Sequence, residues 1–248
     1  MPAPGLFDKI RKMYLLPTIT TTSKDWREKV KEAKDLKLKE ISIFPTCLGL
    51  EERKELYELL KETSIEKIPF VHLRTDMGVW ELNYLVRNFH TKVFNTHSRR
   101  EYPIPSEWDK YRKNIYIENT YFPFDEKEIK EFAGICLDFS HLEASRIYQP
   151  ERYPHDIKMI EKYGSGCGHI SPAPNWNFLD KDIWQFNREK GKNFPHTLKN
   201  LSELDYLKQY PASYFGEYLA LEMENSLKEQ LKAKEYIIKL LKIWSTKR

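Results

Sequence analysis

The chain has few of the features that mark a membrane-spanning, secreted or disulfide-bonded protein. No apolar run approaches the roughly 18 residues that a membrane helix needs, and the N-terminal stretch MPAPGLFDKIRKMYLLP has no long apolar stretch and no small-residue cleavage site. The three cysteines, Cys47, Cys136 and Cys167, are odd in number, and two of them lie in strand-like runs, which argues against a disulfide framework. We therefore expect a soluble, cytoplasmic protein with no membrane partner.

The chain also lacks a concentrated positive charge. Its formal net charge is +4 and its pI is about 8.7, but lysine and glutamate alternate in helix-like segments such as 29–40 and 226–242. This pattern is typical of solvated helix faces and favours them over a nucleic-acid surface. No long linker, low-complexity segment or obvious repeat divides the 248 residues, so we expect a single domain, 1–248, whose oligomeric state is unknown.

Short apolar or β-branched runs recur along the chain. There are eight, at 13–20, 40–44, 70–73, 93–96, 115–118, 134–138, 166–170 and 217–222. Segments between them, such as 23–36, 50–62 and 79–89, have the apolar spacing of helices. Strands alternating with helices predict a parallel sheet, and eight such units in about 250 residues fit an α/β protein with one (β/α)8 TIM barrel. A doubly wound open sheet comes second, because TITTTSKDW stands where its glycine-rich phosphate turn should follow the first strand.

Polar residues end several of the predicted strands, always on the face opposite the aliphatic side chains. In the run 115–118, Tyr116 and Glu118 share one face, whereas Ile115 and Ile117 share the other. The runs 70–73, 135–138 and 217–222 alternate in the same way. Catalytic residues of TIM barrels come from the carboxyl ends of the strands, so this pattern predicts an active site at that mouth.

Seven side chains at these strand ends are candidate metal ligands. They are His72, His97, Glu118, Asp138, His141, His169 and Glu222. Crowded carboxylates repel one another at low dielectric, so a cation is the economical explanation, and neutral imidazoles favour zinc, manganese or iron over magnesium or calcium. Each residue alone has a structural alternative, and Glu224 competes with Glu222 because it has the same strand parity. Their coincidence at six successive strand ends favours a site for a divalent metal, zinc or manganese, with one to three ions.

Further candidates lie in the loops. Arg99 and Arg100 form a tight basic pair beyond His97 that suits one or two phosphates rather than a DNA duplex. His196, in the long connection 171–201, is a candidate ligand or substrate contact. That connection resembles a lid, and its aromatic residues, including Trp176, suit stacking on a sugar, although packing over the barrel mouth explains them equally well. The remaining histidines, at positions 90 and 155, are expected to be structural or exposed.

At these residues the sequence resembles the xylose isomerase-like TIM-barrel superfamily. This superfamily includes sugar phosphate isomerases and epimerases and the endonuclease IV group of DNA repair enzymes (AP endonuclease family 2-like proteins). The stretches IENT (117–120) and GICLDFSHLEAS (134–145) carry the resemblance most strongly. It implies that Glu118 bridges metals, and that Asp138, His169 and Glu222 complete the site that the superfamily shares.

The resemblance also implies roles for three histidines. His141 matches the D-x-x-H histidine, and His72 and His97 match the two histidines that hold an additional metal in the nuclease group. Two departures stand against a complete match. Phe194 stands two residues before His196, where the nuclease group has an aspartate. At the seventh strand this chain has HISP, where many sugar isomerases have His-x-Lys-Asp.

Two enzymatic hypotheses follow from these residues. In the first, one metal polarises a sugar carbonyl while Glu118 and Glu222 move a proton between adjacent carbons and His141 stabilises the oxyanion, as in an isomerase or epimerase acting on a sugar or sugar phosphate. In the second, His72 and His97 hold a second metal, and the pair serves a phosphodiesterase that acts on DNA. A non-catalytic metal-binding barrel is the third reading. Dispersed charge and missing DNA-reading loops favour the isomerase narrowly.

Overall fold

The computed structural model describes residues 13–173 and 196–242. The predicted lid at 171–201 therefore lies largely outside the described residues, and so does Trp176, the predicted substrate contact within it. The strands are β1 (Tyr14–Leu16), β2 (Thr18–Thr20), β3 (Glu40–Phe44), β4 (Lys67–His72), β5 (Val93–Thr96), β6 (Ile115–Glu118), β7 (Ile135–Asp138), β8 (Ser165–Ile170) and β9 (Tyr218–Leu221).

Helices alternate with most of these strands. The α-helices are α1 (Trp26–Asp35), α2 (Leu50–Lys61), α3 (Val79–Phe89), α4 (Glu126–Glu131), α5 (Phe139–Tyr148), α6 (Tyr153–Tyr163) and α8 (Leu227–Leu240). The 3-10 helices are η1 (Ser106–Asn114), η3 (Leu201–Gln209) and η4 (Ala212–Tyr214). Each of the eight predicted runs forms strand structure, and the three predicted helical segments form α1, α2 and α3.

The strands form a nearly closed, TIM-like parallel barrel. All pairs are parallel, and the order around the sheet is β1-β9-β8-β7-β6-β5-β4-β3-β2. The described chain has nine strands rather than the predicted eight, so the (β/α)8 count is not confirmed. Pro17 is the physical reason, because it has no backbone N–H for a strand ladder and separates β1, which pairs with β9, from β2, which pairs with β3.

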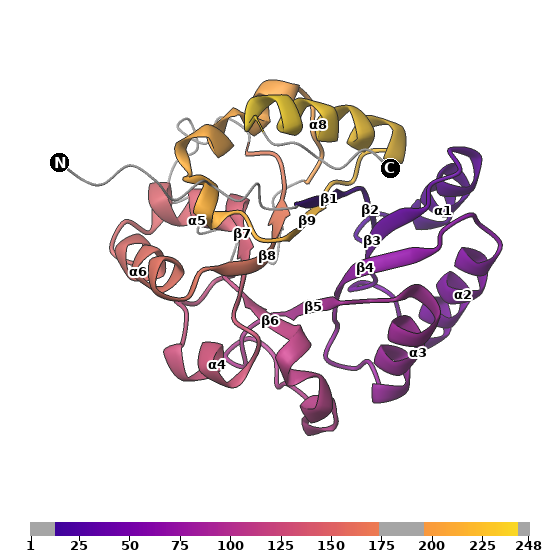
Figure 1. The fold of residues 1–248 in the computed structure, drawn as a ribbon, viewed down its shortest axis with the longest axis horizontal. Coiled ribbons are helices and arrows are strands. Elements are labelled where there is room, and N and C mark those ends of the chain that lie inside the picture. Colours follow the sequence, from indigo (N-terminus) through magenta and orange to yellow (C-terminus); the bar gives the residue numbers. More distant parts are fainter. Residues whose placement is uncertain (1–12, 174–195, 243–248) are drawn as a thin grey trace, which may run out of the picture.

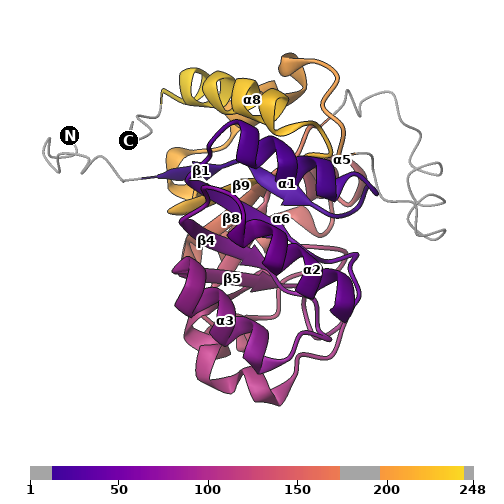
Figure 2. The same ribbon diagram turned by 90° about the vertical axis from the view of Figure 1, so that its right-hand side faces the viewer.

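The helices surround the strands (Figure 1). Figure 2 shows α1, α2 and α3 in front of the strands and α8 above them. A 3-10 helix, η1, connects β5 to β6 in place of an α-helix. Among the described residues, the side chains of the barrel interior come from the strands.

The predicted alternation of side chains along the strands is confirmed. Tyr116 on β6 packs in the barrel interior, whereas Ile115 and Ile117 pack in the outer core against helices. Cys136 on β7 likewise faces the interior, and Leu137 faces outward. The interior cluster consists of Leu16, Phe44, Phe70, Val93, Cys136, Cys167 and Ala220, with Tyr14, Tyr116 and Tyr218 packed against it. This apolar interior lies beneath the polar residues that end the strands.

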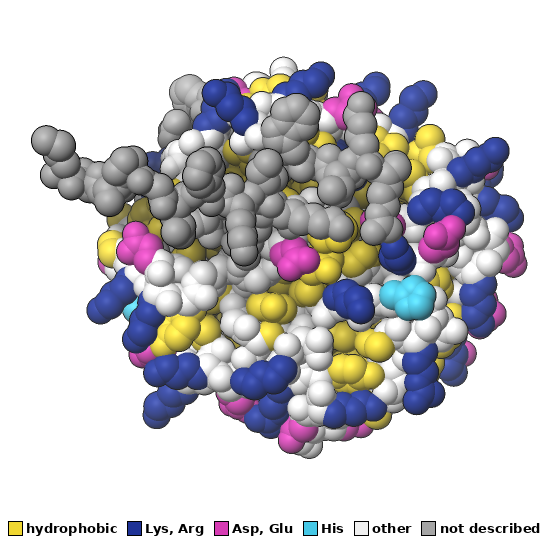
Figure 3. All heavy atoms as spheres, viewed as in Figure 1, with side chains coloured by type: hydrophobic (Ala, Val, Ile, Leu, Met, Phe, Trp, Pro, Cys, Tyr) yellow, Lys and Arg dark blue, Asp and Glu magenta, His cyan; other side chains and the backbone are white. Residues whose placement is uncertain are grey.

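Positively and negatively charged side chains are mixed on one face of the molecule. On the face in Figure 3, Lys and Arg side chains are spread around the edge with Asp and Glu among them. That distribution agrees with the lysine–glutamate alternation of the sequence. Within the described ranges, no helix is both long and apolar enough to cross a bilayer.

Candidate metal centre

A cavity opens at the carboxyl ends of the strands. Its volume is about 530 Å³, within the range of small-molecule sites. Five of the seven predicted ligands line it, namely His72, His97, Glu118, His141 and Glu222, together with His196 from the 171–201 connection. The other two predicted ligands, Asp138 and His169, are completely buried beside it. All seven residues that were selected from the strand-end pattern therefore lie at the same mouth of the barrel.

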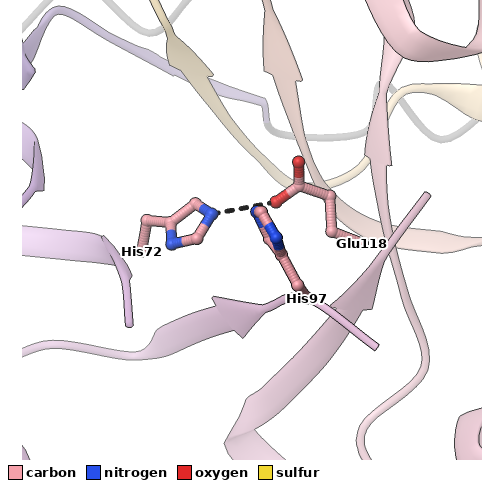
Figure 4. A group of neighbouring side chains, drawn as sticks. All are labelled: His72, His97 and Glu118. Atoms are coloured by element: carbon pink, nitrogen blue, oxygen red, sulfur yellow. Dashed lines mark ion pairs between the residues drawn. The ribbon is translucent and has the colours of Figure 1, made fainter. Parts of the chain in front are cut away.

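The first cluster joins three neighbouring strands. His72 ends β4, His97 follows β5 directly, and Glu118 ends β6. Figure 4 shows the three side chains pointing toward one another, with His72 Nε2 3.1 Å from Glu118 Oε2. One nitrogen or oxygen atom from each of the three lies within 4.8 Å of the other two. We call this group the outer cluster.

The protein itself fixes both histidines of the outer cluster. His72 Nδ1 lies 3.0 Å from the carbonyl oxygen of Leu73, which only accepts, so this nitrogen carries a proton and donates it. His97 Nδ1 lies 2.9 Å from Glu101 Oε2 and donates in the same way. His72 Nε2 faces Glu118 Oε2 at 3.1 Å, about the separation of two ligand atoms on one ion. A hydrogen bond of the other ring nitrogen to a carbonyl or carboxylate is what holds metal-binding histidines in place.

Glu101 also alters the titration of its neighbour. Partial burial opposes the charged form of His97, but the hydrogen bond to Glu101 and the charge of Glu118 outweigh it and raise the pKa of His97. Glu118 itself is held by the amide of Asn95, whose Nδ2 donates to Oε2 over 2.7 Å. Neither Glu101 nor Asn95 was predicted from the sequence, although Asn95 lies two residues before His97 on the inward face of β5.

The second cluster comes from the other half of the barrel. Asp138 ends β7, His169 lies opposite it on β8, and Glu222 follows β9. His169 Nδ1 is 3.8 Å from Asp138 Oδ2, 3.5 Å from Glu222 Oε2 and 3.6 Å from Glu118 Oε2. We call Asp138, His169 and Glu222 the inner cluster. Glu118 lies beside both clusters and connects them.

The two carboxylate oxygens of Asp138 have different surroundings. Oδ1 caps α5, because it accepts from the backbone N–H of His141 at 2.8 Å and from the hydroxyl of Ser140 at 2.7 Å. Asn119 holds the backbone of Asp138 from both sides, accepting from its N–H and donating to its carbonyl. The other oxygen, Oδ2, is buried and has no hydrogen-bond partner among the described residues.

Buried polar atoms without partners gather in the inner cluster. Both ring nitrogens of His169 and Asp138 Oδ2 make no hydrogen bond within the described part of the chain. Such atoms are costly to bury, since their interactions with water are lost and not replaced. Ligand atoms about 2.0–2.2 Å from one tetrahedral ion lie about 3.4 Å apart, close to the 3.5–3.8 Å separations around His169 Nδ1. These residues fit a divalent metal.

Without an ion, the acidic neighbours control the protonation of this cluster. Burial opposes a charge on His169, yet the surrounding groups, among them Cys136, Glu118 and Asp138, outweigh it and raise the pKa of His169 well above its ordinary value. Burial also opposes ionisation of Glu118, but His169 and His72 hold the pKa of that carboxyl well below its usual range. A proton on His169 therefore provides the positive charge that a metal ion would otherwise supply.

His141 and His196 lie at the edge of the centre. One ligand atom each of His141, Glu118 and Asp138 lies within 4.8 Å of the others, and the ring of Tyr121 packs edge-on against His141 at 5.7 Å. His196 Nε2 is 4.0 Å from Glu222 Oε1, and its Nδ1 contacts the hydroxyl of Ser171 at 3.1 Å. The histidines at positions 90 and 155 lie outside the cavity lining.

Glu222 and Glu224 lie in different surroundings. Glu222 lines the cavity and is 18% exposed. Glu224 instead accepts from the Thr197 hydroxyl at 2.9 Å and is absent from the cavity lining. Strand parity does not separate the two residues, because β9 ends at Leu221 and the backbone beyond it no longer alternates as a strand.

The two predicted phosphate-binding arginines lie away from the cavity. Arg99 donates to Glu131 at 2.6 Å, and Arg100 is 3.5 Å from Asp125, so both guanidinium groups pair with carboxylates at or near α4. Arg74, which the sequence analysis did not select, lines the cavity instead. It donates to Thr46 O and pairs with Asp76 at 2.9 Å. Its position two residues after His72 was the available signal.

Comparisons with known proteins give a weak likeness. No family model matches the sequence, and no curated protein matches it. Among solved structures, the crystal structure of AsfvAP:AG, an AP endonuclease structure, has a TM-score of 0.42 and 12% sequence identity, and the match covers 93% of this chain and 98% of that one. Similarity at this level carries no argument about activity.

Proposed function

We propose that this protein is a metal-dependent hydrolase that cleaves a phosphate ester with two divalent ions, zinc or manganese. The proposal depends mainly on how the two histidines of the outer cluster are held. His72 and His97 are held through Nδ1 by Leu73 O and Glu101, and the two rings meet Glu118 with His72 Nε2 3.1 Å from Glu118 Oε2, so the three side chains can hold one ion together. A single-metal isomerase has no need for this second set of ligands.

Each cluster would hold one ion, and Glu118 would contact both. Two such ions, when bound, supply Lewis-acid polarisation of the phosphoryl group and a nucleophile at neutral pH. The chain contributes the positions of the ligands, and it contributes Arg74, the cation of the cavity wall, to bind the substrate anion. Tyr102 and Tyr121 line the same cavity and provide aromatic surface for a sugar or base.

The cavity size and the surface charge favour a small substrate. A volume of about 530 Å³ accepts a sugar phosphate or a single nucleotide unit. A DNA strand would fit this cavity through a single nucleotide that enters it.

The test is hydrolysis by metal-loaded protein, with release of phosphate or alcohol measured from three probes. The probes are a chromogenic phosphodiester, a set of sugar phosphates, and an oligonucleotide with an abasic site. His72→Ala and His97→Ala should each abolish hydrolysis, whereas Arg99→Ala, which changes a residue outside the cavity, should preserve it. Isomerisation or epimerisation that survives both histidine substitutions would overturn the proposal.

A second candidate is a sugar or sugar-phosphate isomerase or epimerase, the reading that the sequence alone favoured narrowly. Its supporting observation is that Glu118 and Glu222 converge on one imidazole, at 3.6 and 3.5 Å from His169 Nδ1. Two carboxylates on one centre suit proton transfer between adjacent carbons. The measurement that separates the candidates is proton exchange between solvent and the substrate carbon, which hydrolysis does not require.

A further inference from the structure

Two cysteines lie directly beneath the candidate metal centre. Cys136 precedes Asp138 by two residues on β7, and Cys167 precedes His169 by two residues on β8. Side chains two residues apart on a strand share one face, so both thiols point into the barrel. The two residues are paired across β7 and β8, and both are 0% exposed. Neither is part of a disulfide.

Only one of these thiols reaches the metal ligands. The Sγ atom of Cys136 and one ligand atom each of Glu118 and His169 all lie within 4.8 Å of one another. Cys167 belongs to no such group among the described residues. The same His169 has two buried ring nitrogens without a hydrogen-bond partner in the described ranges. An imidazole with no hydrogen-bond partner among the described residues therefore lies close to both a carboxylate and a thiol.

Cys136 is fully buried. Apart from Glu118 and His169, its neighbours in the interior cluster are apolar, and the rings of Phe44 and Phe70 pack on His169 at centroid distances of 4.6 and 5.5 Å. A thiolate in such a place requires a positive partner, because an isolated buried charge is strongly unfavourable. A divalent ion supplies that charge.

We propose that Cys136 contributes a thiolate to a metal position formed with His169 and Glu118, which makes the inner part of the centre selective for zinc and other thiophilic ions. When the sulfur–metal bond forms, the thiol proton passes to solvent. Thiolate ligands favour zinc over manganese or magnesium, whereas a site of carboxylates and imidazoles alone discriminates much less. The inference rests on the metal centre of the proposed function and narrows the identity of its ion.

The test is the absorption spectrum of the full-length protein loaded with Co²⁺. A cobalt–thiolate bond gives intense sulfur-to-metal charge-transfer absorption in the near ultraviolet, in addition to the weak visible bands that any bound Co²⁺ shows. We expect the intense absorption in the wild type and in Cys167→Ser, the matched control. It should also persist in Cys47→Ser, which removes the exposed thiol of the cavity wall. Cys136→Ser should lose it and keep the visible bands.

Competition between ions provides a second readout that does not depend on the spectrum. The preference for Zn²⁺ over Mn²⁺ should fall at least about tenfold in Cys136→Ser and stay unchanged in Cys167→Ser. Visible bands without charge transfer in the wild type would overturn the inference and leave the two-metal proposal standing. Absence of both kinds of band would overturn both. If Cys136→Ser fails to fold, charge transfer that persists in both Cys47→Ser and Cys167→Ser still assigns the band to Cys136, because the chain has three cysteines. Loss of the band in either of these two variants would overturn the inference.

Discussion

The outer and inner clusters differ in how their histidines are held. In the outer cluster, His72 and His97 donate from Nδ1 to Leu73 O and Glu101. In the inner cluster, neither nitrogen of His169 has a hydrogen-bond partner among the described residues. The protein alone therefore orients the outer ligands, whereas in the inner cluster the raised pKa of His169 favours a positive charge on the imidazole among the carboxylates.

The outer and inner clusters therefore depend on a bound ion to different degrees. The outer ligands are preorganised, so ion binding there changes little in the surrounding protein. The inner ligands bury unpaired atoms, so their stability depends on an ion or on a proton. Substitutions that act on one cluster only should separate the two positions.

The largest effect is expected where the clusters meet. Glu118→Gln changes the residue next to both clusters and should lower turnover by about 10²–10⁴-fold. Glu224→Gln is the matched control, because Glu224 binds Thr197 outside the cavity lining, and its turnover should stay within about threefold of the wild type. Steady-state kinetics with the metal-loaded protein gives both values. Full turnover in Glu118→Gln would mean that the centre is assigned wrongly.

A smaller effect is expected from the support of the outer cluster. Glu101→Gln should weaken the affinity of one ion by about 10–100-fold, since it removes the carboxylate that orients His97. The second ion should bind as before. Competition with a chromophoric chelator measures both affinities, and Glu128→Gln, which removes a buried carboxylate that binds Ser98 and Arg99 instead, is the control. If Glu101→Gln lowered the affinity of both ions equally, the two clusters would not be separate metal positions.

The inner cluster should respond to pH with two opposite trends. The folded-state pKa of His169 is raised well above 6.5, so the charged imidazole stabilises the metal-free protein below that value, and this contribution is lost as pH rises through the folded-state pKa. Metal affinity should instead rise over the same range, by about tenfold per pH unit for each proton displaced. Thermal unfolding with chelator and zinc titrations between about pH 6 and 9 measure the two trends. Parallel trends would contradict the account.

The smallest effect concerns substrate binding at the mouth. Arg74→Ala should raise KM about tenfold and leave both metal affinities unchanged, because Arg74 lines the cavity and is assigned to no cluster. Arg99→Ala and Arg100→Ala should leave KM unchanged, since these side chains do not line the cavity. The same kinetic assay compares all three variants. If Arg99→Ala raised KM more than Arg74→Ala, the placement of the substrate anion would be wrong.

Residues within strands were predictable because their side chains obey a period of two. His72, Glu118 and Asp138 end strands whose aliphatic residues pack outward, and that alternation placed the first two in the cavity lining and Asp138 beside it. Loop residues carry no such period. Arg99 and Arg100 follow His97 closely in the sequence, yet the backbone turns them toward α4.

Contacts between distant residues were also beyond the sequence. Glu101 on His97 and Asn119 on Asp138 depend on how loops and strands meet in three dimensions. Pro17 did carry a signal in the sequence, since a residue without an N–H interrupts a strand ladder, and it divides the first predicted strand into β1 and β2.

The proposed function depends on a stoichiometry of two divalent ions per chain. Its most direct test is metal analysis of the full-length protein, purified without added ions and then saturated with zinc, by elemental analysis after removal of free metal. We expect two ions per chain in the wild type and one in the His72→Ala/His97→Ala double variant. One ion in both proteins, or none in either, would contradict it.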